Sequence, residues 1–242
     1  MRVMIFGCPH LQSGVTLGSA ALPQTVAWLL ETARNNSVTH IVCLGDTVDS
    51  VSKTDLIVNM QIKWTLDQFK TLAAQGVYTC WMIGNHDVYS DIYSGLDIFD
   101  QAANFNLVKN PTLLGGDDAE LVLWPFQQWM DDPLQWRERT GGMYLQRTGE
   151  KPRILFTHCP IEGMPMGGTK DKGVDLKELA LNFDMLFAGH YHQSNQFMAE
   201  AMSAETPVAV PGSVMGHDFK DLGWFHGALI WDYMPGSTDY PS

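Results

Sequence analysis

Seven short apolar runs, rich in valine, isoleucine and phenylalanine, constrain the fold of this chain more than any other feature. They lie at residues 3–7, 39–45, 77–84, 120–126, 153–158, 184–189 and 227–233. Each has the length and composition of a largely buried β-strand. Stretches with helical periodicity separate the first three runs, so we expect an α/β fold with parallel strand pairing in that half.

Two helices are predicted between these runs. The first covers residues 23–36, where Pro23 suits a first helical turn. The second covers residues 54–75 and ends at Gly76. We expect two apolar series of this second helix to face the core, namely Ile57, Met60 and Trp64, and Leu66, Phe69 and Ala73. From about residue 107 the chain has more strands and fewer helices, which indicates a second, mixed sheet.

Length and composition suit one globular domain over residues 1–242, with no capping domain. The formal net charge of −12 disfavours a broad nucleic-acid surface, because binding phosphates depends on clustered Lys and Arg, although a local basic groove stays open. The four cysteines form no disulfide pattern, the start does not read as a signal peptide, and no apolar stretch approaches a membrane span. We therefore expect a cytoplasmic protein with no membrane partner.

Polar residues follow five of the apolar runs at the point where each run ends. They are GCPH (7–10), GDTVD (45–49), GNHD (84–87), THCP (157–160) and GHYH (189–192). Because ligands of such sheets bind at the carboxyl ends of the strands, we expect the five loops to converge on one edge. A single histidine after a strand is more often structural than a ligand. Five such patches together predict a shared site.

The five patches supply imidazole nitrogens together with carboxylate and amide oxygens. That mixture suits Mn, Fe or Zn, and it is too rich in nitrogen for a Mg or Ca site made only of oxygens. The sequence therefore predicts a site for divalent transition metal ions.

In their order along the chain, these motifs resemble those of the calcineurin-like metallophosphoesterases, from Gly7 to His192. The resemblance implies a four-layer α-β-β-α sandwich of two mixed sheets flanked by helices, with two metal ions at one end. It also implies a hydrolase that acts on phosphoester bonds.

Carried over residue by residue, the resemblance implies two ligand sets that share one carboxylate. The first metal ion is held by Cys8, His10, Asp46 and His192, and the second by Asp46, Asn85, His158 and His190. His86 is then not a ligand but faces the substrate as a general acid or electrostatic clamp, and Asp49 orients it. The alternative for Asp49 is a carboxylate that caps the segment after it.

The implied centre fits the chemistry of phosphoester hydrolysis. Two metal ions about 3.5–4 Å apart can stabilise both the attacking and the leaving oxygens. A water that bridges them loses a proton near neutral pH, which makes a bridging hydroxide the expected nucleophile. The leaving oxygen needs a proton, and a histidine can supply one in this pH range.

Cys8 is the main departure from the family pattern, which has Asp at this position. A metal-bound cysteine is a thiolate, so it keeps the charge of the missing carboxylate but is softer and favours Zn or Fe over Mn. Three interpretations of Cys8 are open. It binds the first metal ion, it does not bind and the first metal site is weak, or the substitution marks a site that has lost its function. Because the other predicted positions match, we favour a ligand.

Two stretches bear on the substrate. Residues 27–50, with the segment WLLETA, and residues 211–233 are similar to SbcD-type DNA repair nucleases. The most basic stretch, residues 136–153, contains Arg137, Arg139, Arg147, Lys151 and Arg153 and is either a solvated hairpin or a modest DNA contact. We therefore favour a small SbcD-like DNA nuclease that cleaves phosphodiesters. The alternatives are a phosphatase or cyclic phosphodiesterase acting on a small molecule or phosphoprotein, and a non-catalytic interaction protein.

Overall fold

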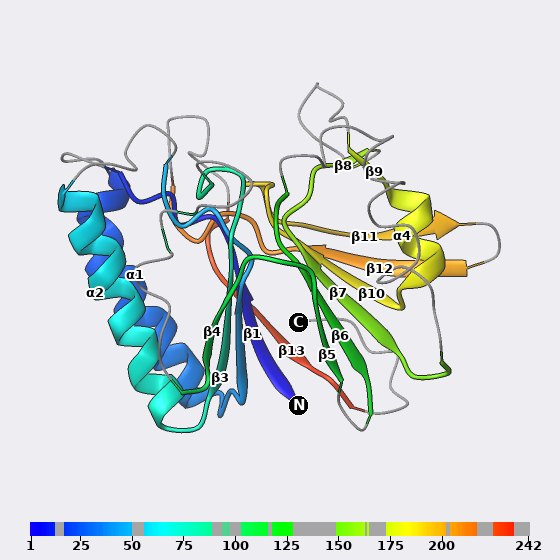
Figure 1. The fold of residues 1–242 in the computed structure, drawn as a ribbon, viewed down its shortest axis with the longest axis horizontal. Coiled ribbons are helices and arrows are strands. Elements are labelled where there is room, and N and C mark those ends of the chain that lie inside the picture. Colours follow the sequence, from blue (N-terminus) through cyan, green and yellow to red (C-terminus); the bar gives the residue numbers. More distant parts are fainter. Residues whose placement is uncertain are drawn as a thin grey trace.

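The computed structural model has the layered α/β architecture that the sequence predicts (Figure 1). It describes residues 1–12, 17–49, 56–88, 94, 96, 103–115, 118–127, 149–162, 164, 173–201, 204–216 and 225–234. Two large sheets lie face to face, and helices cover their outer faces.

The first sheet has the strand order β13-β1-β2-β3-β4. Its strands are β1 (Arg2–Phe6), β2 (His40–Cys43), β3 (Tyr78–Met82), β4 (Phe105–Val108) and β13 (Leu229–Asp232). Strands β1 to β4 run parallel, as the intervening helices predict, whereas β13 is antiparallel to β1. The last apolar run therefore returns to the first sheet, where the amino group of Met1 donates to the backbone oxygen of Tyr233.

The second sheet has the order β11-β12-β10-β7-β6-β5 and is mixed, as predicted. Its strands are β5 (Thr112–Gly115), β6 (Glu120–Trp124), β7 (Arg153–Thr157), β10 (Met185–Ala188), β11 (Asn195–Ala201) and β12 (Ala204–Val210). Its four central strands are parallel, and the two edge strands, β5 and β11, are antiparallel to their neighbours. A small ribbon pairs β8 (Ile161–Glu162) with β9 (Val174–Asp175).

The helices complete a four-layer sandwich. In Figure 1, α1 (Leu17–Asn35) and α2 (Leu56–Ala74) cover the first sheet, and α4 (Leu176–Asn182) covers the second. Alternation along β1 shows how one strand serves two cores, because successive side chains point to opposite faces. Val3 and Ile5 pack in the core between the sheets, while Met4 and Phe6 pack against α1 and α2. The four-layer fold expected from the family resemblance is thus confirmed.

Two details of the helices differ from the prediction. Helix α1 begins at Leu17, so Pro23 lies inside the helix, on its exposed side, and not in the first turn. The apolar series of Ile57, Met60 and Trp64 faces solvent, with exposed fractions of 56, 64 and 40%. Both series of α2 have helical spacing, but they lie on different faces, and only one face can pack on the sheet. The face with Leu66, Phe69 and Ala73 is the buried one.

Among the helices that the structure describes, none has the length and apolar character needed to cross a membrane.

Candidate metal centre and active site

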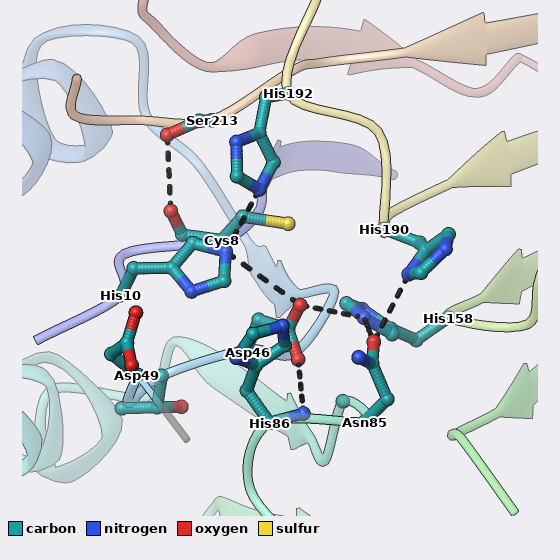
Figure 2. A network of polar contacts seen from close by, with 12 residues as sticks. Cys8, His10, Asp46, Asp49, Asn85, His86, His158, His190, His192 and Ser213 are labelled. Atoms are coloured by element: carbon teal, nitrogen blue, oxygen red, sulfur yellow. Dashed lines mark hydrogen bonds and ion pairs between the residues drawn. The ribbon is translucent and has the colours of Figure 1, made fainter. Parts of the chain in front are cut away.

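All nine predicted site residues lie together at the carboxyl-terminal edge of the sheets (Figure 2). The loops after β1 and β2 run side by side, because the backbone N–H groups of Cys8 and His10 donate to the oxygens of Gly45 and Asp46, both at 3.0 Å. The loops after β3, β7 and β10 bring the remaining residues to the same edge. Parallel pairing in both sheets is what makes this convergence possible.

One group of side chains gathers around His10. Its Nε2 lies 2.9 Å from Nε2 of His192 and 3.6 Å from Oδ2 of Asp46. The ligand atoms of Cys8, His10 and His192 all lie within 4.8 Å of one another. These side chains offer two imidazole nitrogens, a carboxylate oxygen and a sulfur, which are the atom types of a transition-metal site.

A second group gathers on the other side of Asp46. The Nε2 atom of His158 lies 3.1 Å from Oδ2 of Asp46 and 3.1 Å from Oδ1 of Asn85. The Nδ1 atom of His190 lies 3.0 Å from the same Asn85 oxygen. On its other nitrogen, His158 Nδ1 donates to the backbone oxygen of Leu44 at 2.5 Å, and a bond of this kind fixes the orientation of a ligating imidazole.

Asp46 stands between the two groups and is almost fully buried. Burial alone would raise the pKa of its carboxyl, but the nearby His158, His10 and His86 lower that pKa well below its usual range. Burial acts to lower the pKa of His158, but the charge of Asp46 and the hydrogen bonds to Asp46 and the Leu44 backbone together outweigh it, so the pKa of His158 is raised. The carboxylate therefore attracts positive charge from both sides, which is what a bridging ligand must do.

His190 behaves differently from His158. Burial, followed by the charge of His158, lowers the pKa of His190 to about 4. This histidine is therefore neutral at pH 7, and a neutral imidazole is the form that ligates metals.

The Cys8 sulfur belongs to both groups. It lies within 4.8 Å of ligand atoms of His10 and His192, and also of Asp46 and His158. Burial, and then the charge of Asp46, raises the pKa of the thiol well above its usual value. The thiol is thus neutral unless a cation is bound beside it, since a coordinating thiol is deprotonated outright.

His86 and Asp49 lie beside the first group and away from His190 (Figure 2). The backbone N–H of His86 donates to Oδ1 of Asp46 at 2.9 Å, and the His86 ring meets the His10 ring edge-on at 4.9 Å. Nitrogen atoms of His10 and His86 and a carboxylate oxygen of Asp49 all lie within 4.8 Å of one another. The Asp49 carboxylate is thus a neighbour of both the His86 ring and the His10 ring.

Two supporting residues escaped the sequence analysis. The buried carboxylate of Asp87 accepts from the backbone N–H groups of Thr47, Val48 and Gly84, which ties the GDTVD loop to the GNHD loop. Burial, and then the charge of Asp46, raises the pKa of Asp87 to about 7. Asp87 stood within the GNHD motif, but no periodicity shows that its side chain turns inward.

The second supporting residue is Ser213, which is fully buried. Its hydroxyl contacts the backbone oxygens of Met215 and, at 3.1 Å, of Cys8, and its backbone N–H donates to the oxygen of His192 at 2.9 Å (Figure 2). Ser213 thus links the loop after β1 to the loop after β10. It lies within residues 211–233, whose sequence likeness assigned no role to this serine.

Comparison with known proteins identifies the family. A family model described as calcineurin-like phosphoesterase matches residues 1–194. This chain belongs to the calcineurin-like phosphoesterase family. It is therefore a hydrolase of phosphoester bonds, as the resemblance implied. Enzymes of this family depend on two metal ions, and the described side chains of this phosphoesterase include groups that could hold them.

Solved structures agree with the fold of this phosphoesterase. A dimetal phosphatase from Danio rerio is 12% identical, with a TM-score of 0.56, covering 95% of this chain and 91% of that one. An archaeal phosphodiesterase is also 12% identical and covers 96% and 93% of the two chains, but its TM-score of 0.43 is too low to add to the argument. Among curated protein sequences, none matches the chain.

Proposed function

We propose that this phosphoesterase hydrolyses phosphodiesters with a dinuclear centre of divalent transition metal ions. The observation that carries the proposal is the position of Asp46 between two ligand groups. One carboxylate oxygen of Asp46 lies 3.6 Å from Nε2 of His10 and 3.1 Å from Nε2 of His158. A carboxylate with imidazoles on both sides is suited to bridge two cations.

The residues present fit two metal ions. Facing nitrogens such as those of His10 and His192, at 2.9 Å, need either a proton or a cation between them. The first ion would be held by Cys8, His10, Asp46 and His192. The second would be held by Asp46, Asn85, His158 and His190. When bound, the ions would supply an activated water and neutralise charge on the phosphoryl oxygens.

We assign the proton transfer to His86. Its backbone is held by Asp46, so its ring is placed beside the centre without being committed to a metal. From there the imidazole would donate a proton to the leaving oxygen, and the carboxylate of Asp49 would fix the tautomer that carries this proton. General acid help of this kind contributes ~10²–10⁴-fold in rate.

We assign Cys8 as a ligand. Its position between the two groups and its burial support this role, because a buried thiol among histidines and a carboxylate has the surroundings of a metal ligand. A thiolate there would bias the centre towards Zn or Fe over Mn.

For the substrate, we propose DNA cleaved by a small SbcD-like nuclease. The support is the sequence likeness of residues 27–50 and 211–233 to that group. The net charge of −12 favours the alternative, a phosphatase or cyclic phosphodiesterase for a small molecule or phosphoprotein. The basic stretch of residues 136–153 also offers less positive charge to DNA than expected, because Arg153 is buried and paired with Glu120 at 2.9 Å. Arg137, Arg139 and Arg147 lie outside the described residues.

One set of assays separates these substrates. Purified protein is tested on single-stranded DNA, double-stranded DNA and bis-p-nitrophenyl phosphate, each with Mn, Fe and Zn. A nuclease cleaves DNA as well as the small diester. Cleavage of the small diester with both DNA forms intact would favour the alternative, and activity on none of them would contradict the proposed function.

A further inference from the structure

A cavity of about 490 Å³ lies at the edge of the sheets opposite to the metal centre. It is lined by His40 and Tyr78, the first residues of β2 and β3, by Tyr233 after β13, and by residues of the β5–β6 hairpin. Both sheets thus contribute to it. The volume falls within the range of sites for small molecules, which is about 300–1,000 Å³.

The walls of the cavity are apolar and aromatic. Leu114 and Leu121 form part of them and also pack against the core between the sheets. The rings of His40 and Tyr78 lie 5.8 Å apart and are tilted by 52°. Flat side chains beside leucines favour a planar, largely apolar ligand.

The polar groups of the cavity are mainly acceptors. We assign to His40 the tautomer protonated at Nδ1, in which this nitrogen donates to the Thr39 hydroxyl at 2.8 Å and the hydroxyl donates to the backbone oxygen of Arg2 at 3.0 Å. Nε2 of His40 is then left as an acceptor, because burial lowers the pKa of this histidine and keeps it neutral. Tyr233 donates its hydroxyl hydrogen to the backbone oxygen of Asp118, so the hydroxyl oxygen of Tyr233 can still accept a hydrogen bond from a ligand.

The charges around the cavity further restrict the class of ligand that it can bind. The carboxylate of Asp118 has no ion pair within the described part of the chain, and the described lining residues include no Lys or Arg side chain. The charged amino group of Met1 also lines the cavity, where one of its N–H groups donates to the backbone oxygen of Tyr233 and its charge helps to lower the pKa of His40. The lining thus offers a phosphorylated ligand this one ammonium group and no basic side chain, whereas His40 and Asp118 offer acceptors to a ligand that carries N–H donors.

From these observations we propose that the cavity binds a planar heteroaromatic amine, neutral or cationic, that donates hydrogen bonds to His40 and Asp118. This site is separate from the phosphoester chemistry and does not depend on the proposed substrate. Tryptamine, indole and indole-3-acetate serve as probes, because they share one ring system and differ in charge.

Binding of the three probes is measured by isothermal titration calorimetry. Tryptamine binds most tightly, with a Kd of about 1 mM, which is reasonable for a molecule of this size. Indole binds more weakly, and indole-3-acetate most weakly. Absence of binding by tryptamine, or equal binding of the cationic and anionic probes, would overturn the proposal.

Two variants and their controls locate the site. Leu113→Trp narrows the cavity and lowers tryptamine affinity at least about tenfold, while Leu181→Trp, at a leucine on α4 with a similar exposure (46 against 48%), leaves it unchanged. Asp118→Asn weakens the binding of tryptamine by about threefold and leaves the binding of indole unchanged, whereas Glu162→Gln changes the affinity for neither probe. Tryptamine binding that survives Leu113→Trp would place the site elsewhere and refute the assignment. Hydrolysis of bis-p-nitrophenyl phosphate stays at the wild-type rate in all four variants.

Discussion

Residues with a positive φ occur at both edges of the sheets, but they serve different purposes at the two edges. Six non-glycine residues among those described have a positive φ: Cys8, His10, Ser37, Asp46, Asn104 and His190. Ser37 and Asn104 lie at the amino-terminal edge, are exposed, and are residue types found in turns. Ser37 follows the end of α1, and the amide of Asn104 donates to the oxygen of Ala73 at the end of α2.

The other four residues lie at the carboxyl-terminal edge and belong to the candidate metal centre. A positive φ costs a residue other than glycine about 1–2 kcal/mol. At the amino-terminal edge this cost serves turns, because Ser37 follows α1 and Asn104 directly precedes β4. At the carboxyl-terminal edge it places two histidines, an aspartate and a cysteine around one point. At the carboxyl-terminal edge the backbone accepts this cost where it brings ligand side chains to one shared position. Each prediction below tests one part of that contrast between the edges.

The largest effect is expected for Asp46→Ala. Loss of the shared carboxylate removes a ligand from both metal sites, so the variant should bind neither ion and hydrolyse diesters no faster than metal-stripped wild-type protein. Elemental analysis of the purified variant, beside a bis-p-nitrophenyl phosphate assay, measures both. Two retained metal equivalents would show that Asp46 is not the bridge.

His86→Ala should separate catalysis from metal binding. We expect turnover to fall by ~10²–10⁴-fold with the metal content of wild type, because the imidazole acts on the leaving group and not on a metal. Turnover of the diester and metal content are measured on the same preparation. If the variant lacks a metal equivalent, the role assigned to His86 is wrong.

Gly84→Ala and Gly76→Ala compare the two edges directly. A methyl group on Gly84 would overlap the backbone nitrogen and carboxylate of Asp46, so we expect ~1–3 kcal/mol lower stability and at least about tenfold weaker metal binding. Gly76 has a φ of 96° and open space around it, so its variant should lose about 1 kcal/mol and keep full metal affinity. Urea unfolding and metal titration measure the two effects. Equal loss of metal affinity in both variants would remove the contrast between the edges.

Cys8→Asp should change metal preference without abolishing catalysis. The substitution restores a harder ligand of equal charge, so the ratio of activity with Mn to activity with Zn should rise. Cys8→Ser should be the least active of the three proteins, because a neutral hydroxyl brings no charge to the site. The ratio and the bound metal are determined for all three. Identical values would mean that Cys8 never touches a metal ion.

Ser213→Ala should give the smallest effect. It removes the hydroxyl that contacts the backbone oxygens of Cys8 and Met215, a loss of about 1 kcal/mol, so binding of the metal equivalent beside Cys8 should weaken about fivefold while the other is unchanged. Thr206→Ala is the control, since Thr206 also has a buried hydroxyl, but this hydroxyl donates to the backbone oxygen of Ala180 in α4. A metal titration in which both variants behave alike would reduce Ser213 to a general packing role.

The short apolar runs, with helical stretches between the first three, predicted an α/β fold with a second, mixed sheet, and the family resemblance implied the four-layer sandwich. The sequence also predicted which residues meet at the carboxyl-terminal edge, since each follows a strand of a parallel pair. The sequence did not predict correctly which apolar face of a helix is buried, because that depends on what each face packs against. Trp64 and Phe69 belong to two apolar series of α2 that each have helical spacing, and only packing against the first sheet decides that the series with Phe69 is buried.

The supporting contacts were also beyond reach of the sequence. Ser213 lies 205 residues from Cys8, and no local pattern indicates that its hydroxyl contacts the Cys8 backbone. Asp87 sat in a recognised motif, but its three backbone donors come from two loops whose approach is set by the whole sheet. Arg153 looked like part of a basic surface because its ion-pair partner, Glu120, belongs to the neighbouring strand.

The most direct test of the two-metal centre is a metal titration of chelator-stripped protein. Bound metal and hydrolysis of bis-p-nitrophenyl phosphate are followed together as Zn, Fe or Mn is added. The stripped protein should be inactive, and activity should reach its maximum as the second equivalent binds. Full activity in the stripped protein, or full activity at one equivalent with no second ion bound, would contradict the dinuclear centre built around Asp46.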